Sequence, residues 1–523
     1  MFRIIYLFVL LNLFSISLNA QQNNPLVKLK LDLEKTAQVI ENFGSSGCWY
    51  SESVGNFWPS EKKEKIAELL FSQKINENGS LAGIGLSAWR FNIGAGTLEQ
   101  GSNSGIKDFN RRTDSFLNPD GTYDWSKQAG QRFFLQKAKD YHVETLIAFS
   151  NSPPIQFTKN SLGYKTEKDF TANLRDDSYN AYAIFLTNVT KHFEEQNIHF
   201  SYISPVNEPQ WDWSREPGKA DQEGSPWTNN EISKVAKTLN TALENEKLSS
   251  KILISEAGML NYLYAGTGKA THQIQSFFDI KSPLYLGNLS RVPKTIAGHS
   301  YFTESNNKML LETRNHLADT IRKYHLKFWQ SEYSMLADGF REGEQGDRNP
   351  MDCALFLAKV IHADLTVGNA TAWQFWNAYE PGNAKRNTRY YLIALQPKPD
   401  FRDGEFAVVK NLWALGHYSR FVRPGMTRVL TETIADKETE VQKNLLVSAF
   451  KNKNNKLVLV LINYGKTDIN VELTIKNAKR NYAKATTYVT SAEEGVDMKL
   501  QGRRKSLEIT QIKARSIQTI LLD

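Results

Sequence analysis

Residues 179–206 read YNAYAIFLTNVTKHFEEQNIHFSYISPV, and this stretch carries the repeating unit of the fold. From 179 to 195 the apolar residues recur with the period of an α-helix. A short run rich in aromatic and β-branched residues follows from 200 to 206, as is typical of a buried strand. The same alternation of short apolar runs and longer amphipathic stretches extends from residue 39 to residue 376. This order predicts parallel strands covered by helices.

Eight strands are expected in this region, at 39–45, 86–92, 145–150, 200–206, 252–256, 295–300, 327–332 and 371–376. Helical periodicity fills the gaps, for example at 61–71, 179–195, 231–243, 310–324 and 353–365. Eight strand–helix units predict an α/β fold of the (β/α)8 TIM barrel type. A doubly wound sheet is disfavoured, because the glycines of NFGSSG at 42–47 do not have the spacing of a dinucleotide-binding turn.

After about residue 424 the pattern changes to alternating runs typical of an antiparallel β-sandwich. Strands are expected at 445–450, 456–463, 469–475, 485–489, 506–510 and 516–522. The segment LVKLKLDL at 26–33 also alternates, so we expect it to complete this side domain from the N-terminal end. The predicted domains are therefore a signal peptide at 1–20, an N-terminal strand of the side β-domain at 21–38, a catalytic barrel at 39–420 and a side β-sandwich at 421–523.

The N-terminus has the three parts of a secretory signal peptide. Arg3 precedes an apolar run from 4 to 18, and a small-residue site ends at Ala20 before a polar segment. We therefore expect cleavage near Ala20 and a secreted or periplasmic protein without a membrane span. The chain has only two cysteines, Cys48 and Cys353, which leaves either one disulfide or two buried thiols. The net charge of +8 is spread along the chain, so no nucleic-acid partner is expected.

Two glutamates end predicted strands on opposite sides of the barrel. Glu208 follows the fourth strand in SPVNEPQW at 204–211, and Glu332 ends the seventh strand in QSEY at 330–333. Reactive groups of such barrels lie at the carboxyl ends of the strands. Hydrolysis of a glycosidic bond needs one carboxylic acid and one carboxylate around the anomeric carbon, and these two residues meet that need. The sequence therefore predicts Glu208 and Glu332 as the catalytic pair.

Together with the segment WALGHYSRFVRPG at 413–425, these motifs resemble glycoside hydrolase family 30 over nearly the whole mature chain. The resemblance implies a retaining mechanism, with Glu208 as acid/base and Glu332 as nucleophile. It also implies that Asn207 binds the sugar 2-hydroxyl and that Arg90, in AWRFN at 88–92, lies near the nucleophile. An arginine there would favour the anionic nucleophile, while partial burial without such a neighbour would raise the pKa of Glu208.

Several further residues are expected to bind substrate. His299, at the end of the sixth strand, and Tyr333 could contact sugar or pack the rim, whereas Glu256 at the end of the fifth strand is expected to support the site by hydrogen bonding. Because sugars present apolar C–H faces, a polysaccharide cleft needs flat aromatic platforms. The best placed candidates are Trp211, Trp213, Trp373 and Trp376. No metal-ligand spacing is present, so no metal or cofactor is expected.

Within the family, SNSPP at 150–154 and the loop containing WDW at 211–213 and QEGS at 222–225 look most like the endo-β-1,6-galactanase branch. The expected substrate is then β-1,6-linked galactan, such as arabinogalactan side chains. A β-1,6-glucanase or a glucosylceramidase-like enzyme would use the same glutamates and stays an alternative. A non-catalytic carbohydrate-binding protein on a barrel scaffold is a remote alternative. Partners other than a polysaccharide or oligosaccharide are not indicated.

Overall fold

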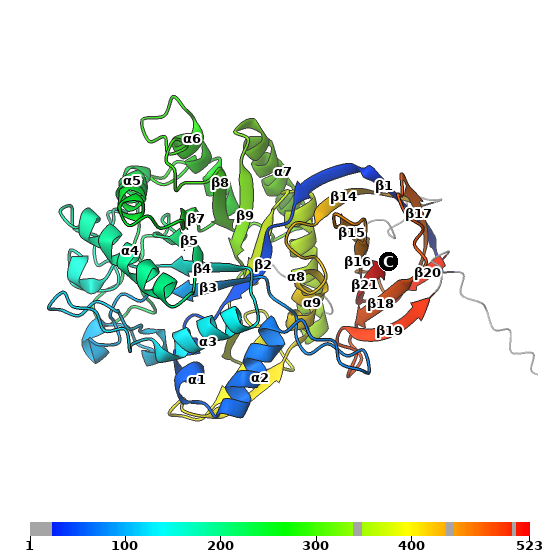
Figure 1. Ribbon diagram of the computed structural model, residues 1–523, viewed down its shortest axis with the longest axis horizontal. Coiled ribbons are helices and arrows are strands. Elements are labelled where there is room, and N and C mark those ends of the chain that lie inside the picture. Colours follow the sequence, from blue (N-terminus) through cyan, green and yellow to red (C-terminus); the bar gives the residue numbers. More distant parts are fainter. Residues whose placement is uncertain (1–23, 338–347, 436–443, 505–508) are drawn as a thin grey trace, which may run out of the picture.

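The computed structural model describes residues 24–337, 348–435, 444–504 and 509–523 (Figure 1). It confirms the predicted fold class, a barrel with a side β-sandwich. The barrel strands are β2 (Asn42–Ser46), β3 (Ala88–Asn92), β4 (Thr145–Phe149), β5 (Phe200–Ser204), β6 (Lys251–Ile252), β7 (Ile254–Ala257), β8 (Thr295–His299), β9 (Lys327–Glu332) and β10 (Ala372–Phe375). Neighbouring strands pair in parallel in the order β6-β5-β4-β3-β2-β10-β9-β8-β7.

The fifth barrel position is shared by two short strands, β6 and β7. Leu253 separates them, and its N–H donates to the carbonyl of Ile203 at 2.9 Å. This bond keeps the interrupted strand against β5, so the sheet closes into a barrel. The sequence had predicted one uninterrupted strand at 252–256.

Helices cover the outside of the barrel (Figure 1). They are α1 (Ser51–Phe57), α2 (Ser60–Phe71), α3 (Ala129–Asp140), α4 (Tyr179–Glu195), α5 (Asn229–Asn245), α6 (Gln273–Phe278), α7 (Asn307–Lys323), α8 (Pro350–Thr366) and α9 (Lys410–Ser419). Local sequence sets where they begin. At α5, the Thr228 side chain accepts from the N–H of Glu231, and the Glu231 carboxylate accepts from the N–H of Thr228. Most residues of α8 are buried, because this helix packs between the barrel and the side domain.

The side domain is built on one nine-stranded sheet. Its strands are β1 (Leu26–Val39), β14 (Thr427–Ala435), β15 (Leu445–Lys451), β16 (Leu457–Asn463), β17 (Ile469–Lys476), β18 (Ala485–Thr490), β19 (Lys499–Arg504), β20 (Ile509–Ile512) and β21 (Ser516–Leu522). β1 lies between β14 and β17, antiparallel to the first and parallel to the second. In Figure 1 it is the blue strand among the orange and red ones. The predicted N-terminal contribution to this domain is thus confirmed.

Several elements of this half were not predicted from the sequence. β14 and β19 are extra strands, and a small sheet of β11 (Tyr379–Pro381), β12 (Ile393–Pro397) and β13 (Gly404–Val408) follows the last barrel strand. The strand expected at 506–510 includes residues 506–508, which lie outside the described residues, and β20 begins at Ile509.

The signal peptide predicted at 1–20 also lies outside the described residues. Within the described ranges, none of the helices combines the length and apolar character needed to cross a bilayer. Cys48 and Cys353 are both buried and free, so the two-thiol alternative holds.

Candidate active site

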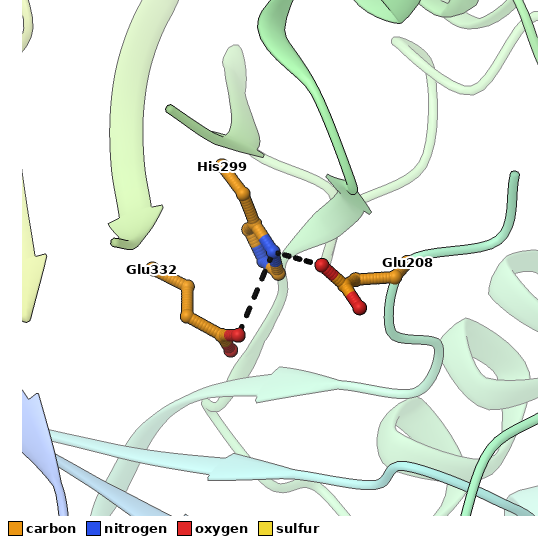
Figure 2. A group of neighbouring side chains, drawn as sticks. All are labelled: Glu208, His299 and Glu332. Atoms are coloured by element: carbon orange, nitrogen blue, oxygen red, sulfur yellow. Dashed lines mark hydrogen bonds and ion pairs between the residues drawn. The ribbon is translucent and has the colours of Figure 1, made fainter. Parts of the chain in front are cut away.

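Glu208 and Glu332 meet at the mouth of the barrel. Glu332 is the last residue of β9, and Glu208 lies four residues beyond the end of β5. Both are almost fully buried, with 8 % and 5 % of their surface exposed. One carboxylate oxygen of each, together with one ring nitrogen of His299, lies within 4.8 Å of the others. Figure 2 shows His299 between the two glutamates.

The backbone of Glu208 takes an unusual conformation with φ of +44°. Side chains other than glycine rarely adopt this region, so surrounding contacts must hold it. Its N–H donates to the carbonyl of Glu256 at 2.9 Å, and its carbonyl accepts from the N–H of Trp211 at 3.2 Å. The indole N–H of Trp213 donates to the same carbonyl at 3.1 Å. These three bonds turn the Glu208 side chain toward the mouth.

Two donors reach the carboxylate of Glu332. Nη1 of Arg90 donates to Oε2 at 2.7 Å, and the hydroxyl of Tyr301 donates to Oε1 at 3.0 Å. Arg90 comes from β3 and is buried, with its guanidinium 4.2 Å from the ring centre of Phe149. Arg90 therefore lies next to Glu332, as the sequence analysis expected.

Glu256, from β7, is buried below the pair as a supporting carboxylate. It accepts from the hydroxyls of Ser204, at 2.6 Å, and Ser331. Arg90 Nη2 lies 3.6 Å from Oε1. Burial opposes the charge of Glu256, but the nearby Arg90 and His299 outweigh burial and lower its pKa to about 2. Glu256 is thus a permanent anion beneath the reactive groups.

His299, at the end of β8, is buried among three carboxylates. Its Nδ1 lies 3.0 Å from Glu208 and its Nε2 lies 3.3 Å from Glu256. Nδ1 is also 3.7 Å from Glu332. Burial alone would lower the pKa of the imidazole, but the charge of Glu332 and the bonds to the other two glutamates raise it to about 10. His299 is therefore an imidazolium that donates from both ring nitrogens.

These charges can be balanced within the site. Arg90 and His299 supply two cations, Glu256 and Glu332 supply two anions, and Glu208 completes a neutral set when it is protonated. Burial raises the pKa of Glu208, although His299 works in the opposite direction. A neutral set is what a buried cluster requires, since unpaired buried charge is costly.

Glu208, His299 and Glu332 also lie close enough together to bind one metal ion. A metal-binding histidine must present a neutral ring nitrogen with a free lone pair. In this structure each ring nitrogen of His299 already has a carboxylate partner, Nδ1 with Glu208 at 3.0 Å and Nε2 with Glu256 at 3.3 Å. We therefore assign the three residues to acid–base and electrostatic roles.

A cavity of about 940 Å³ opens above the pair. Next to Glu208 its wall is formed by Trp211, whose ring centre is 6.2 Å from Tyr262 and 6.3 Å from Phe302. Trp376 and Trp49 also line the cavity, with ring centres 5.2 Å apart, and the Trp376 ring centre lies 6.0 Å from the Arg90 guanidinium that pairs with Glu332. The cavity therefore has an aromatic wall on each side of the carboxylates.

The predicted binding residues divide into three groups, of which the first lines the cavity and the second lies beneath it. Asn207, Trp211, Trp213 and Trp376 line the cavity, and Oδ1 of Asn207 is buried with no hydrogen-bond partner among the described residues. Arg90 and His299 lie beneath the carboxylates instead of in the wall.

Trp373 and Tyr333 do not reach the cavity, so we remove them from the expected sugar contacts. Trp373 is fully buried and its indole N–H donates to Asp364 at 2.8 Å. Tyr333 is fully buried and its hydroxyl donates to Glu304 at 3.3 Å. Successive side chains of a strand point to opposite faces. Trp373 in β10 and Tyr333, the residue after β9, therefore point away from the barrel mouth and into the core.

Sequence reasoning missed much of the wall, including Tyr301, Trp49, Arg111 and Glu380. The guanidinium of Arg111 lies 4.5 Å from the ring centre of Trp49. Burial raises the pKa of Glu380 to about 7, and Arg111 partly offsets this rise. Only Tyr301 carried a usable signal, since it lies two residues beyond a predicted strand-end histidine. Trp49 and Arg111 come from connections whose course the sequence does not specify, and Glu380 comes from β11, which was not predicted.

Comparison with known proteins covers both domains. Residues 26–390 match the profile of the O-glycosyl hydrolase family 30, and residues 427–520 match the glycosyl hydrolase family 30 beta sandwich domain. Among characterised proteins, an endo-beta-1,6-galactanase of Hypocrea rufa is 24% identical over 419 residues, which is 74% of this chain and 77% of that protein.

Solved structures share the same architecture. A conserved exported protein from Bacteroides fragilis is 32% identical with a TM-score of 0.87, and the match covers 94% of this chain and 100% of that one. An endo-beta1,6-glucanase is 16% identical with a TM-score of 0.61, covering 94% of this chain and 93% of that one. The second likeness concerns the fold alone.

Proposed function

Since this chain belongs to glycoside hydrolase family 30, we propose that it is a secreted endo-β-1,6-galactanase that acts with retention of anomeric configuration. The observation that carries the mechanism is the separation of the two carboxylates. Oxygens of Glu208 and Glu332 lie within 4.8 Å of each other. Retaining glycosidases hold their carboxyl groups about 5–5.5 Å apart, whereas inverting ones need about 6.5–9.5 Å to admit a water molecule.

The first step breaks the glycosidic bond. Glu332 is the nucleophile, because Arg90 and Tyr301 stabilise its carboxylate from both oxygens. Its attack forms a bond to the anomeric carbon while the bond from that carbon to the leaving oxygen breaks. Glu208 gives its proton to the leaving oxygen, which its raised pKa favours. The product is a glycosyl ester of Glu332 with the leaving sugar released as an alcohol.

The second step releases the sugar. The Glu208 carboxylate takes a proton from water, and the water oxygen attacks the anomeric carbon and displaces Glu332. The imidazolium of His299 stabilises Glu208 in its anionic form between the two steps, since Nδ1 lies 3.0 Å from it. Each carboxylate returns to its starting state, and the anomeric configuration is retained.

The cavity supports binding of a polysaccharide within its chain. The leaving sugar must lie on the Glu208 side, where Trp211, Tyr262 and Phe302 form a wall for its apolar face. The sugar that bonds to Glu332 and its continuation lie toward Trp376 and Trp49. Room on both sides of the cleavage point favours endo action. Asn207, with its unpartnered Oδ1, would accept a bond from the 2-hydroxyl.

The choice of galactan follows the Hypocrea rufa relative, which is described as an endo-beta-1,6-galactanase. Secretion is supported by the signal-like residues 1–20 and by the Bacteroides fragilis relative, which is described as an exported protein. Neither the sugar nor the linkage follows from the two glutamates alone. Galactose and glucose differ at one hydroxyl, which residues of the surrounding loops must recognise.

The test is product profiling of the mature enzyme on β-1,6-galactan, β-1,6-glucan, xylan and aryl glycosides, with NMR of the first product anomer. We expect galactan oligosaccharides released as the β-anomer. Cleavage of glucan alone would contradict the galactan assignment, and release of the α-anomer would contradict the retaining mechanism. The Glu332→Gln variant serves as control, and equal product release from it and the parent would contradict the mechanism.

A further inference from the structure

Glu223 is a completely buried carboxylate outside the reactive cluster. Its Oε1 accepts from the hydroxyls of Thr97, at 2.5 Å, and Thr113, at 2.7 Å. The N–H of Ala95 lies 3.3 and 3.2 Å from its two oxygens. All three donors belong to the loop that follows β3, whereas Glu223 belongs to the loop between β5 and α5. One buried side chain therefore joins two loops at the barrel mouth.

The residue after Glu223 rests directly on Trp213. A Cβ added to Gly224 would lie 2.4 Å from Cδ2 of the indole, so only glycine permits this contact. The N–H of Gly224 also donates to the carbonyl of Gly163 at 2.9 Å. The indole of Trp213 is consequently held at a place that Glu223 and its neighbour define.

Trp213 in turn holds the backbone of Glu208. Its indole N–H donates to the Glu208 carbonyl at 3.1 Å. Both residues have positive φ, +48° for Trp213 and +44° for Glu208, a conformation that needs outside support. A loop that shifted by even a small distance would lose this bond and let Glu208 relax toward ordinary φ values.

We propose that Glu223 is a positioning residue for the proton donor, acting through Gly224 and Trp213 on the backbone of Glu208. The inference rests on the proposed function, because it takes Glu208 as the acid/base. Glu223 itself is too deeply buried to touch sugar. Its effect is therefore confined to the transfer of the Glu208 proton to the leaving oxygen.

This role can be separated from a general structural one by varying the leaving group. A leaving group such as 2,4-dinitrophenolate departs without a proton, whereas 4-methylphenolate or a sugar needs one. A displaced proton donor thus affects only the second kind of substrate. Loss of general acid catalysis costs about 10²–10⁴-fold in rate, which sets the scale of the effect.

The experiment measures kcat/KM of the mature enzyme on aryl β-glycosides of β-1,6-linked galactobiose and, in a parallel arm, of β-1,6-linked glucobiose. For Glu223→Ala we expect a loss of about 100-fold with 4-methylphenyl and less than about 3-fold with 2,4-dinitrophenyl. Glu223→Gln keeps the acceptor for both threonine hydroxyls and should recover most of the lost rate. Trp213→Phe, which removes the indole N–H donor to Glu208 together with part of the ring, should reproduce the selective loss.

The matched control is Glu216→Ala, an exposed residue of the same loop that pairs with Lys219, and we expect no change in either series. Equal losses with both leaving groups, in Glu223→Ala and in Trp213→Phe alike, would overturn the positioning role. A parent enzyme that cleaves only the glucobiosides would contradict the galactan assignment. The positioning role is then tested with the glucobiosides, by the same comparison of the losses with 4-methylphenyl and 2,4-dinitrophenyl leaving groups.

Discussion

Nη1 of Arg90 lies 2.7 Å from Oε2 of Glu332, and both side chains are buried. The pair joins β3 to β9 across the barrel, and Arg90 also reaches Glu256 through Nη2 at 3.6 Å. One guanidinium thus serves two buried carboxylates. A lysine carries its donors on one compact nitrogen and lacks the planar fork by which two separate nitrogens reach the two carboxylates here.

We expect Arg90→Lys to lower kcat at least about 100-fold, because Glu332 loses a fixed donor in a water-poor site. The unfolding free energy should also fall, because the shorter and differently shaped cation cannot keep the geometry of this buried ion pair. Steady-state kinetics and urea unfolding measure the two effects. Arg322→Lys, at an exposed pair with Asp319, is the control that should change neither. An Arg90→Lys enzyme with the parent's kcat would contradict the assignment.

The pH dependence of kcat/KM should show a basic limb set by Glu208. Burial raises its pKa, so the acid form persists above the ordinary range, and activity falls as pH rises through the raised value. His299 opposes this rise by its bond and its charge. In His299→Gln the basic limb should therefore move to higher pH. A limb that stays in place or moves to lower pH would show that the histidine does not act on Glu208.

Stability should depend on pH through Glu256 and His299 in two separate windows. The pKa of Glu256 is lowered to about 2 in the folded state from an ordinary 4.5, so its contribution is present above 4.5 and is lost as pH falls toward 2. The pKa of His299 is raised to about 10 from 6.5, so its contribution is present below 6.5 and is lost as pH rises toward 10. Urea midpoints measured across pH should fall in both windows.

Variants assign each window to its residue. Glu256→Gln should flatten the acid window, and His299→Gln should flatten the alkaline one. Glu405→Gln, at an exposed position, is the matched control. Unchanged slopes in the two site variants would show that other groups govern stability in these ranges.

Trp211 and Trp373 should respond to mutation in opposite ways. Trp211 lines the cavity, so Trp211→Ala should raise KM for polysaccharide with little effect on stability. Trp373 is buried and bonds Asp364, so Trp373→Ala should cost about 3–5 kcal/mol of stability while KM stays near the parent value. Thermal unfolding and kinetics on the same two proteins give the comparison. Equal KM changes in both would contradict the placement of Trp373.

The strands of the barrel could be predicted because each is a short apolar run between long amphipathic helices. β9 was placed at its observed bounds, 327–332. β14 was missed because Thr427–Ala435 mixes exposed and buried positions without a clean alternation. The small sheet of β11, β12 and β13 was missed because its strands lie in a loop rich in charged residues and proline, where propensity gives no clear signal.

The site could be predicted only as far as strand ends reach. Glu332 and Glu256 were found because each ends a predicted strand, and Glu208 because it follows one closely, whereas Arg90 was indicated only by the family resemblance. Trp373 was misplaced because β10 is buried on both faces, so its sequence does not show which side chains point into the barrel. Contacts between distant loops, such as Glu223 with Thr97 and Thr113, depend on loop paths that no local pattern encodes.

The place of β1 has a consequence for how the chain is completed and divided. Val27 pairs with both Ala435 and Val471, so the earliest described strand can take its place only after two of the late strands have been made. The side domain therefore closes at the end of synthesis, long after the barrel segment has emerged. A chain cut after residue 424 would leave β1 with neither partner and its apolar face in water. Any separation of the two domains must remove residues 24–39 together with the C-terminal sheet.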